Sequence, residues 1–574
     1  MITESLPARS APAAPARPRW WRREPVLVVL LGFALAAAFN LPLIRHPRTT
    51  VAADLGDPLL QTWQLAWHRR FLTRGGDFWT ANSFFPAQDA FAFSDSLLGY
   101  SPLALLFGDG PHAAVLRYNT AYLLACALAF IGAYFLVRQL GGNWQAAALA
   151  GAAAAWAPWR LAHGGHLNVL STGGIALALF ALARGHGYAL RPGARPRAAR
   201  PGWVLAGWLI GAWQITLGFA VGIPFFYLMA GVGAVVCLFL LRRRGESGRR
   251  VVLANAVGGA VFLAVTALMA VPYLRVVERY GFTRPWSEVS ALSAPPAGLL
   301  AVPGSSWLWG GSALDDQAGL SPVAPWENLL FPGLALLVTA FVGLFVSAWP
   351  VRVRVVLAVA AVAVTVPALG AGVLGGAYTY RPLWEFLPGW DALRAPGRLV
   401  LWTVLLLSLL AAGAVTGLGR RVGGRRRAPV AAALVVPAAF TLLEGLPVRP
   451  HPRVPDVPPG LAEVFEQVRV PMVVVPMDLA AEFRHLLWST RGWPTLANGN
   501  SGNFPPAHAE LVEATKRFPD SHSIDVLDRH GIRALVVVKS AAAGTPWAST
   551  TARPTTGYPL TRTETGDVVL FTVK

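Results

Sequence analysis

Long apolar segments recur along the chain, and they constrain its fold more than any other feature. A helix needs about 20 predominantly apolar residues to cross the hydrocarbon core of a bilayer. Eleven segments reach or approach that length: 26–43, 113–137, 145–160, 167–184, 203–220, 222–241, 251–272, 328–348, 353–373, 399–418 and 428–446. The sequence therefore predicts a multispanning α-helical membrane protein with about 11 transmembrane helices.

The composition agrees with a membrane protein and argues against a nucleic-acid-binding one. Only 14% of the 574 residues are charged, where a soluble chain would have about 25%. The net charge of +20 comes from short Arg clusters between apolar segments, so no nucleic-acid partner is expected. The two cysteines, Cys126 and Cys237, both lie in apolar runs, which excludes a disulfide scaffold and a Cys-based zinc site.

The Arg clusters predict how the chain is oriented in the membrane. They lie at 9–23, 191–200, 242–250, 352–354 and 420–427. With eleven spans, all five clusters fall on the same side, and the positive-inside rule makes that side cytoplasmic. We therefore expect a bacterial inner-membrane protein with a cytoplasmic basic N-terminus (1–25), a transmembrane domain (26–447) and an extracytoplasmic C-terminal domain (448–574).

Most of the polar material lies on the predicted outer face. Three outer loops are expected at 44–112, 273–327 and 375–398, whereas the inner loops are short and basic. In the tail, strand-like runs at 470–476, 533–539 and 567–573 are separated by helical patterns at 460–468, 505–517 and 522–530. This alternation predicts a small α/β domain. Its turn-rich stretch 498–506 could contact a sugar or serve as a structural loop.

The first outer loop carries the candidate catalytic carboxylates, Asp54 and Asp57. They precede a stretch, 58–71, whose apolar residues recur at helical spacing, so we expect an amphipathic helix with Trp63 and Trp67 at headgroup depth. A carboxylate here could act as a general base or hold a divalent cation such as Mg²⁺ or Mn²⁺. The alternative is helix capping, because Asp57 before Pro58 is a good N-cap.

Basic side chains at the other outer boundaries are candidates for binding a phosphate. In 159–172 they are Arg160, His163 and His166, and the alternative is that they are interfacial polar residues meeting lipid headgroups. Arg275 and Arg279 share one helical face, where they could form a fork for an anion or meet lipid phosphates. Arg394 and Arg398 lie in the third loop, and Arg398 could instead snorkel at the start of a span.

Six stretches carry a resemblance that covers most of the chain. They are GDPLLQTWQLAW (56–67), NSFFPAQDAFAFSDSLLGYSPL (82–103), WRLAHGGHLNVLST (159–172), ENLLFPGLALL (327–337), LPGWDALRAPGRL (387–399) and NGNSGNFPP (498–506). With this layout, the chain resembles a bacterial group of GT-C-type membrane glycosyltransferase-like proteins. The resemblance implies a polyprenyl-phosphate sugar donor, inversion at the sugar, and Asp57 or Asp54 as the first-loop carboxylate. Many GT-C enzymes have adjacent acidic residues here, whereas Leu55 and Gly56 separate these two.

The sequence thus predicts a glycosyltransferase that acts on the outer face of the membrane, with membrane lipid around it and an envelope glycan, lipid or protein as acceptor. A lipid or polysaccharide flippase is one alternative, although the polar residues within the spans are mainly neutral: Asn119, Gln214 and Asn255. A non-catalytic scaffold of envelope polysaccharide assembly is another. It would tolerate replacement of every first-loop aspartate.

Overall fold

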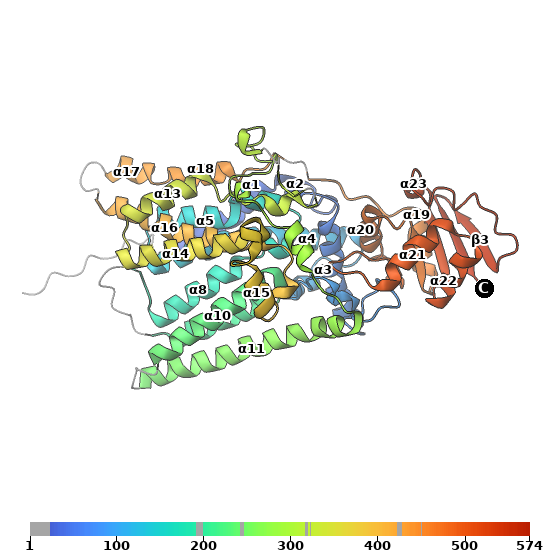
Figure 1. The fold of residues 1–574 in the computed structure, drawn as a ribbon, viewed down its shortest axis with the longest axis horizontal. Helices are drawn as coiled ribbons and strands as arrows, with labels where there is room; N and C mark the ends of the chain where they lie inside the picture. Colours follow the sequence, from blue (N-terminus) through green and yellow to red (C-terminus); the bar gives the residue numbers. More distant parts are fainter. Residues whose placement is uncertain are drawn as a thin grey trace, which may run out of the picture.

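The protein is elongated, with a helical bundle at one end and a four-stranded sheet at the other (Figure 1). The computed structural model describes residues 23–190, 199–240, 246–315, 319–321, 323–421, 427–448 and 451–574. The segment 44–112, predicted as the first outer loop, contains α3 (Asp57–Arg74), which lies between the bundle and the sheet (Figure 1). This arrangement brings the start of α3 close to segments from much later in the chain.

A helix coincides with each of the predicted apolar segments. The bundle consists of α1 (Glu24–Phe39), α4 (Pro111–Leu140), α5 (Trp144–Trp156), α8 (Gly173–His186), α9 (Pro201–Ile215), α10 (Phe219–Leu240), α11 (Glu246–Tyr280), α13 (Leu334–Phe345), α14 (Val351–Ala368), α16 (Val400–Arg421), α17 (Arg427–Ala433) and α18 (Val436–Glu444). Among the described residues, six helices are long and apolar enough to cross a membrane, and shorter apolar helices accompany them. The helical membrane class is confirmed, and the count of about 11 spans stays a prediction.

Parts of the Arg clusters used to predict the orientation lie outside the described residues, namely 1–22, 191–198, 241–245 and 422–426. The described members flank helix ends, such as Arg352 and Arg354 at the start of α14 and Arg420 and Arg421 at the end of α16. Figure 1 shows both of these helix ends, with the start of α11, at the end of the bundle away from the sheet.

Small residues let the bundle helices pack closely. A Cβ atom added to Gly132 of α4 would lie 2.7 Å from the carbonyl oxygen of Gly173 in α8, and one on Gly151 of α5 would lie 2.7 Å from the ring of Phe130. Close backbone approach of this kind is a main source of packing between membrane helices. By contrast, α11 and α14 expose large apolar side chains such as Leu268 and Val356, as expected of lipid-facing helices.

The C-terminal sheet has helices on both faces. Its strands run in the order β1 (Met472–Val475), β2 (Ala534–Val538), β4 (Val568–Val573) and β3 (Leu560–Thr565), with β1 and β2 parallel and the other pairs antiparallel. The remaining elements are α19 (Pro459–Gln467), α20 (Leu479–Trp488), α21 (Pro506–Arg517), α22 (Ser521–Arg529) and α23 (Lys539–Ala542). Alternate side chains of β1 enter two different apolar clusters, so the strand is a run of buried valines, as is typical of parallel pairs.

The three strand-like runs and the three helical patterns of the tail all have counterparts in the structure, in β1, β2 and β4 and in α19, α21 and α22. Strand β3 escaped prediction because its sequence, LTRTET, is polar and mostly exposed. It forms the edge of the sheet and pairs only with β4. An edge strand of this composition lacks the apolar pattern from which strands are recognised.

Helix α3 is buried within the protein, so the prediction of an amphipathic helix lying in the membrane interface is wrong. Trp63 and Trp67 are each 3% exposed. Their indole N–H groups donate to Asn82 Oδ1 and to the carbonyl oxygen of Phe78. Helices α4 and α20 both contact α3. The apolar spacing of 58–71 therefore reflects a helix surrounded by other elements rather than by lipid.

Backbone hydrogen bonds join the C-terminal part to the first outer loop. The N–H groups of Phe84 and Phe85 donate to the carbonyl oxygens of Asn498 and Leu496, at 2.9 and 2.8 Å, and the N–H of Leu496 donates back to Asn82. Residue Leu496 also forms a parallel bridge with Met472 of β1. Residues 82–85 thus extend the sheet by a short additional pairing, in which Asn498 at the start of the turn-rich stretch takes part.

Candidate functional site

The start of α3 presents Asp57 toward a histidine and away from the helix backbone. The N-cap of α3 is Gly56, and no side chain caps this helix. The capping interpretation of Asp57 is therefore wrong. Instead, Asp57 Oδ2 lies 3.3 Å from His166 Nε2, and the Asp57 side chain is 41% exposed while that of His166 is 17% exposed. Asp57 thus has a basic partner and an open side.

The position of His166 is fixed by α3 itself. His166 ends the connection between α6 (Trp159–Ala162) and α7 (Leu167–Leu170). Gln61, one turn after Asp57, accepts a hydrogen bond from the N–H of Leu167 at 3.1 Å and donates to Asn168 Oδ1 at 3.2 Å. Since residues four apart share one face of a helix, Asp57 and Gln61 hold the same segment.

Asp54 has a different environment from Asp57. The N–H of Gly56 donates to Asp54 Oδ1 at 2.8 Å, which is the local turn that Asp side chains favour. The carboxylate also lies against Gly165, where an added Cβ would come within 2.9 Å of Asp54 Oδ2. Asp54 is exposed, and its described contacts hold the turn before α3.

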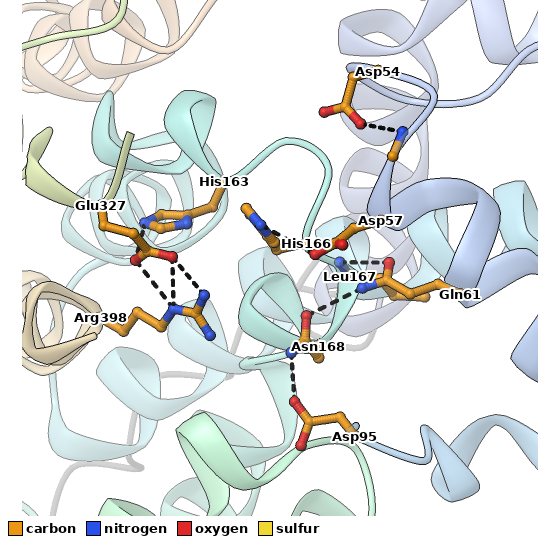
Figure 2. A network of polar contacts seen from close by, with 11 residues as sticks. Asp54, Asp57, Gln61, Asp95, His163, His166, Leu167, Asn168, Glu327 and Arg398 are labelled. Carbon is orange, nitrogen blue, oxygen red and sulfur yellow. Dashed lines mark hydrogen bonds and ion pairs between the residues drawn. The ribbon is translucent and has the colours of Figure 1, made fainter. Parts of the chain in front are cut away.

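A buried ion pair lies on the other side of the two histidines. Glu327 belongs to η6 (Pro325–Asn328) and Arg398 to η10 (Pro396–Leu399). Arg398 Nη2 lies 2.5 Å from Glu327 Oε1, and Nε lies 3.2 Å from both carboxylate oxygens. Figure 2 shows His163 and His166 between this pair and Asp57. Among the described contacts only Nε and Nη2 of Arg398 meet Glu327, so Nη1 stays available for a ligand.

His163 is fully buried between His166 and the ion pair of Glu327 and Arg398 (Figure 2). Its Nε2 lies 4.0 Å from Glu327 Oε2, its ring centroid lies 5.4 Å from that of His166, and neither ring nitrogen has a hydrogen-bond partner among the described residues. Burial lowers the pKa of His163 to about 3, against the opposing effect of Glu327. His163 is therefore neutral and adds no charge to the site.

Neighbouring side chains keep the Glu327 carboxyl ionised. Burial alone would raise the pKa of this carboxyl, but Arg398 and His163 hold it well below its usual range. Glu327 is therefore ionised at neutral pH. Because Glu327 offsets the charge of Arg398, the free side of this guanidinium offers a ligand mainly its N–H donors.

Asp95 adds a further carboxylate to the cluster that contains Asp57 and Glu327 (Figure 2). Asn168 Nδ2 donates to its Oδ2 at 2.5 Å, and the N–H of Phe219 donates to its Oδ1 at 2.6 Å. Burial raises the pKa of Asp95, and these two donors oppose the shift. Through Asn168 and Gln61, Asp95 is linked to the segment that carries His166.

The other predicted phosphate-binding residues have partners elsewhere. Arg275 and Arg279 of α11 reach Asp89, at 3.6 and 2.7 Å. Arg394 lies 3.1 Å from Glu288. Arg160 is buried, donates to the carbonyl oxygen of Leu170 and to Thr172 Oγ1, and lines a cavity with Asn40 and Cys126. No described contact joins these four arginines to Asp57 or His166.

The structure therefore brings together four of the predicted site residues, Asp57, His163, His166 and Arg398, with Asp54 beside them. It adds Gln61, Asp95, Asn168 and Glu327, which the sequence did not single out. All four lie in stretches that carry the family resemblance, and that shared location is the signal that could have found them. Within the described ranges, no three His, Cys, Asp or Glu side chains are grouped so that they could hold a metal ion.

Comparison with known proteins gives one family and several structures. A family model described as "Domain of unknown function (DUF6311)" matches residues 79–439. No curated protein sequence matches the chain. The cryo-EM structure of the arabinofuranosyltransferase AftD from Mycobacteria is similar with a TM-score of 0.55 at 16% identity, covering 96% of this chain and 40% of that one. The chain therefore spans well under half the length of AftD.

Two other solved structures are more distant. AglB, an oligosaccharyltransferase from Archaeoglobus fulgidus solved with an inhibitory peptide and a dolichol-phosphate, has a TM-score of 0.46 at 12% identity, covering 91% of this chain and 70% of that one. ArnT from Cupriavidus metallidurans has a TM-score of 0.38 at 16% identity, covering 96% and 97%. The likeness to AftD shows that the chain has a GT-C-like fold, as the sequence resemblance implied.

Proposed function

The chain belongs to the family described as a domain of unknown function (DUF6311), and from that membership and its GT-C-like fold we propose that it is a membrane glycosyltransferase. It transfers a sugar from a polyprenyl-phosphate-linked donor to an envelope glycan, lipid or protein acceptor. The reaction takes place at the outer face of the bacterial cytoplasmic membrane. Because fold alone does not establish an activity, the proposal rests on the site.

One observation carries the proposal: a half-exposed carboxylate and a guanidinium with a free amino group belong to one cluster (Figure 2). The cluster includes the start of α3, which lies between the bundle and the sheet (Figure 1). A displacement at a sugar carbon needs a base on the incoming side and positive charge on the leaving phosphate. Asp57 supplies the base and Arg398 Nη1 supplies the charge. The two side chains reach the cluster from opposite sides of the histidines.

The reaction then proceeds with inversion. Asp57 takes the proton of the acceptor hydroxyl as the hydroxyl oxygen attacks C1 of the donor sugar. The bond from C1 to the phosphate oxygen breaks, and the electron pair stays on the phosphate, where Arg398 stabilises it. Glu327 keeps Arg398 in place and neutralises its inner side, so that only one edge of the guanidinium faces the ligand. A divalent cation is not required by this scheme.

The proposed topology follows from the same layout. Described Arg residues flank helix ends at the end of the bundle away from the sheet (Figure 1), which the positive-inside rule makes the cytoplasmic end. The N-terminus 1–25 is then cytoplasmic, residues 26–447 form the membrane domain, and residues 448–574 form an extracytoplasmic domain. The site consequently lies at the outer boundary, where the phosphate of a lipid-linked donor would be.

The test uses the purified full chain in lipid nanodiscs with short-chain polyprenyl-phosphate sugars. An arabinofuranosyl donor comes first, because the mycobacterial neighbour is an arabinofuranosyltransferase. We expect the chain to release polyprenyl phosphate, which is detected by mass spectrometry. The rate of this release should fall about 100-fold or more in the Asp57→Asn variant. The matched control is Asp77→Asn, in the same loop, whose carboxylate accepts only from the N–H of Trp79 among the described contacts. A folded Asp57→Asn protein with full activity would remove Asp57 from this role.

A further inference from the structure

We propose that His166 is a positioning residue for Asp57: its Nε2–H donates to Asp57 Oδ2 and thereby leaves Oδ1 facing the acceptor hydroxyl. The inference rests on the proposed function, because it assigns how the base of that reaction is held. It goes beyond that function in giving a specific role to a histidine that the acceptor does not reach.

The order of exposure from the open side inward supports this role. The Asp57 side chain is 41% exposed, that of His166 is 17% exposed, and that of His163 is fully buried. An acceptor that enters from the open side therefore meets Asp57 before it meets either histidine. Because His166 Nε2 already faces Asp57 and its Nδ1 is buried, neither nitrogen of His166 is placed to act as the base.

The surroundings of His166 favour a hydrogen on Nε2. A neutral imidazole carries one hydrogen, on either nitrogen. If Nδ1 carried it, a buried donor would have no acceptor among the described residues, and the unprotonated Nε2 would lie 3.3 Å from a carboxylate oxygen. With the hydrogen on Nε2, the donor meets Asp57 Oδ2 at 3.3 Å. A hydrogen on Nε2 therefore avoids an unpaired buried donor at Nδ1, which would be destabilising by about 1–3 kcal/mol.

Helix α3 holds both members of this contact. Asp57 lies in its first turn, and Gln61 in the next turn accepts from the N–H of Leu167, the residue directly after His166. Gln61 also donates to Asn168, which in turn donates to Asp95. The distance between Asp57 and His166 is thus set by a rigid element and not by a free loop. Gln61 therefore positions His166 relative to Asp57 through the backbone of Leu167.

No other charged group in the cluster can take over this role. On the inner side, His163 is uncharged and Glu327 is occupied by Arg398. On the far side of Asn168, Asp95 accepts from two donors of its own. Asp54 faces Gly56 and Gly165. Among the described contacts, His166 is therefore the basic group paired with the Asp57 carboxylate, with Nε2 3.3 Å from Oδ2.

The test compares replacements at 166 that keep or remove the donor. Gln places an amide N–H near the position of Nε2, whereas Phe and Met fill the space without a donor. We expect His166→Phe to lower the turnover number for donor consumption about 10- to 100-fold, the scale of a small misplacement of a reacting group. His166→Gln should stay within about threefold of the wild type, a change of under 1 kcal/mol in the barrier. His166→Met serves if the Phe variant does not fold.

Gln61→Met provides the second measurement. It should lower turnover less than His166→Phe, and the double variant should be no worse than His166→Phe alone, because both act through one contact. Full activity of the Phe variant, or a Gln variant as inactive as the Phe variant, would overturn the inference while leaving the glycosyltransferase proposal intact. If the wild-type chain consumes none of the short-chain polyprenyl-phosphate sugars, the proposed function fails, and the role of His166 fails with it.

Discussion

The acidic side chains near the sheet end of the bundle fall into two groups with different surroundings. Glu327, Asp89 and Glu482 are buried, and at least two N–H donors or basic groups meet each carboxylate. Asp54 and Asp57, at the start of α3, keep an open side. In the first group, Glu327 and Asp89 join segments that are far apart in the sequence, whereas the side chains of the second group are partly open to solvent.

The difference shows how one kind of residue serves two purposes. Burying a carboxylate is costly unless donors or opposite charges surround it, so a buried acid is fixed to a single arrangement. An exposed acid with one partner keeps lone pairs for another molecule. Charge alone therefore does not identify a catalytic carboxylate in this protein, and the number of its partners does so better. Four substitutions test this division, from the largest expected effect to the smallest.

Glu327→Ala should give the largest loss of stability. It leaves the guanidinium of Arg398 poorly exposed and without its bidentate partner, and removing one member of a buried pair costs about 3–5 kcal/mol. We expect a clear fall in the unfolding temperature of the purified chain, followed by tryptophan fluorescence in detergent. The matched control is Glu385→Ala, whose partner Arg381 is half-exposed and whose loss should cost under about 1 kcal/mol. Equal effects of the two variants would contradict the division.

The pairing of Glu327 with Arg398 could not be predicted from the sequence. Asp57 and Arg398 were predicted from their places in outer loops, and the structure brings both into the cluster. Glu327 is an isolated acid 71 residues from its partner, and no spacing rule connects residues in different loops. The Arg275 and Arg279 fork was predicted on one helical face, but its target is Asp89 of the first loop. Local patterns give the elements and their faces, while pairing between loops depends on the fold.

The carboxyl of Glu482 should make stability depend on pH. Burial raises its pKa to about 8, against hydrogen bonds from Asn498 and Gly499, whereas an unfolded glutamate titrates near 4.3. Between these values the folded chain holds a proton that the unfolded chain has lost. Its contribution is therefore complete below about pH 4 and falls by up to about 1.4 kcal/mol per pH unit until pH 8.

Glu482→Gln should flatten this dependence, measured as the change in unfolding temperature between about pH 5.5 and 7.5. Glu463→Gln is the control, because Glu463 is exposed on α19 of the same region. An unfolding temperature of the Glu482→Gln protein that falls with pH as steeply as that of the wild type would show that Glu482 does not carry the effect.

The wrongly predicted location of helix α3 also concerns burial. Its sequence has the apolar spacing and the Trp pair of an interfacial helix, yet the protein covers it on all sides along 58–68. Three polar residues of this helix, Gln61, Gln64 and His68, are buried and hydrogen-bonded to other segments. A polar face predicts that partners are needed, but it does not distinguish water and headgroups from protein donors.

Asp89→Asn should have a smaller effect than Glu327→Ala. Asp89 has a positive φ of 54°, which Asn tolerates better than most residues, so the change removes the charge and little else. Arg275 and Arg279 are half-exposed, so they regain water when the carboxylate is lost. We expect a loss of about 1–2 kcal/mol in unfolding free energy and unchanged donor consumption. A large loss of activity would mean that this fork also serves the substrate.

Asp54→Ala should have the smallest effect of the four, and it separates the two open carboxylates. Asp54 accepts a hydrogen bond from the next residue but one and fills space beside Gly165, whereas Asp57 faces His166. If only Asp57 is the base, Asp54→Ala keeps donor consumption within about threefold of the wild type and lowers the unfolding temperature less than Asp89→Asn does. A loss as large as that of Asp57→Asn would mean that the two aspartates act together. In that case an open side, rather than the contact with His166, would be the property that defines the catalytic group.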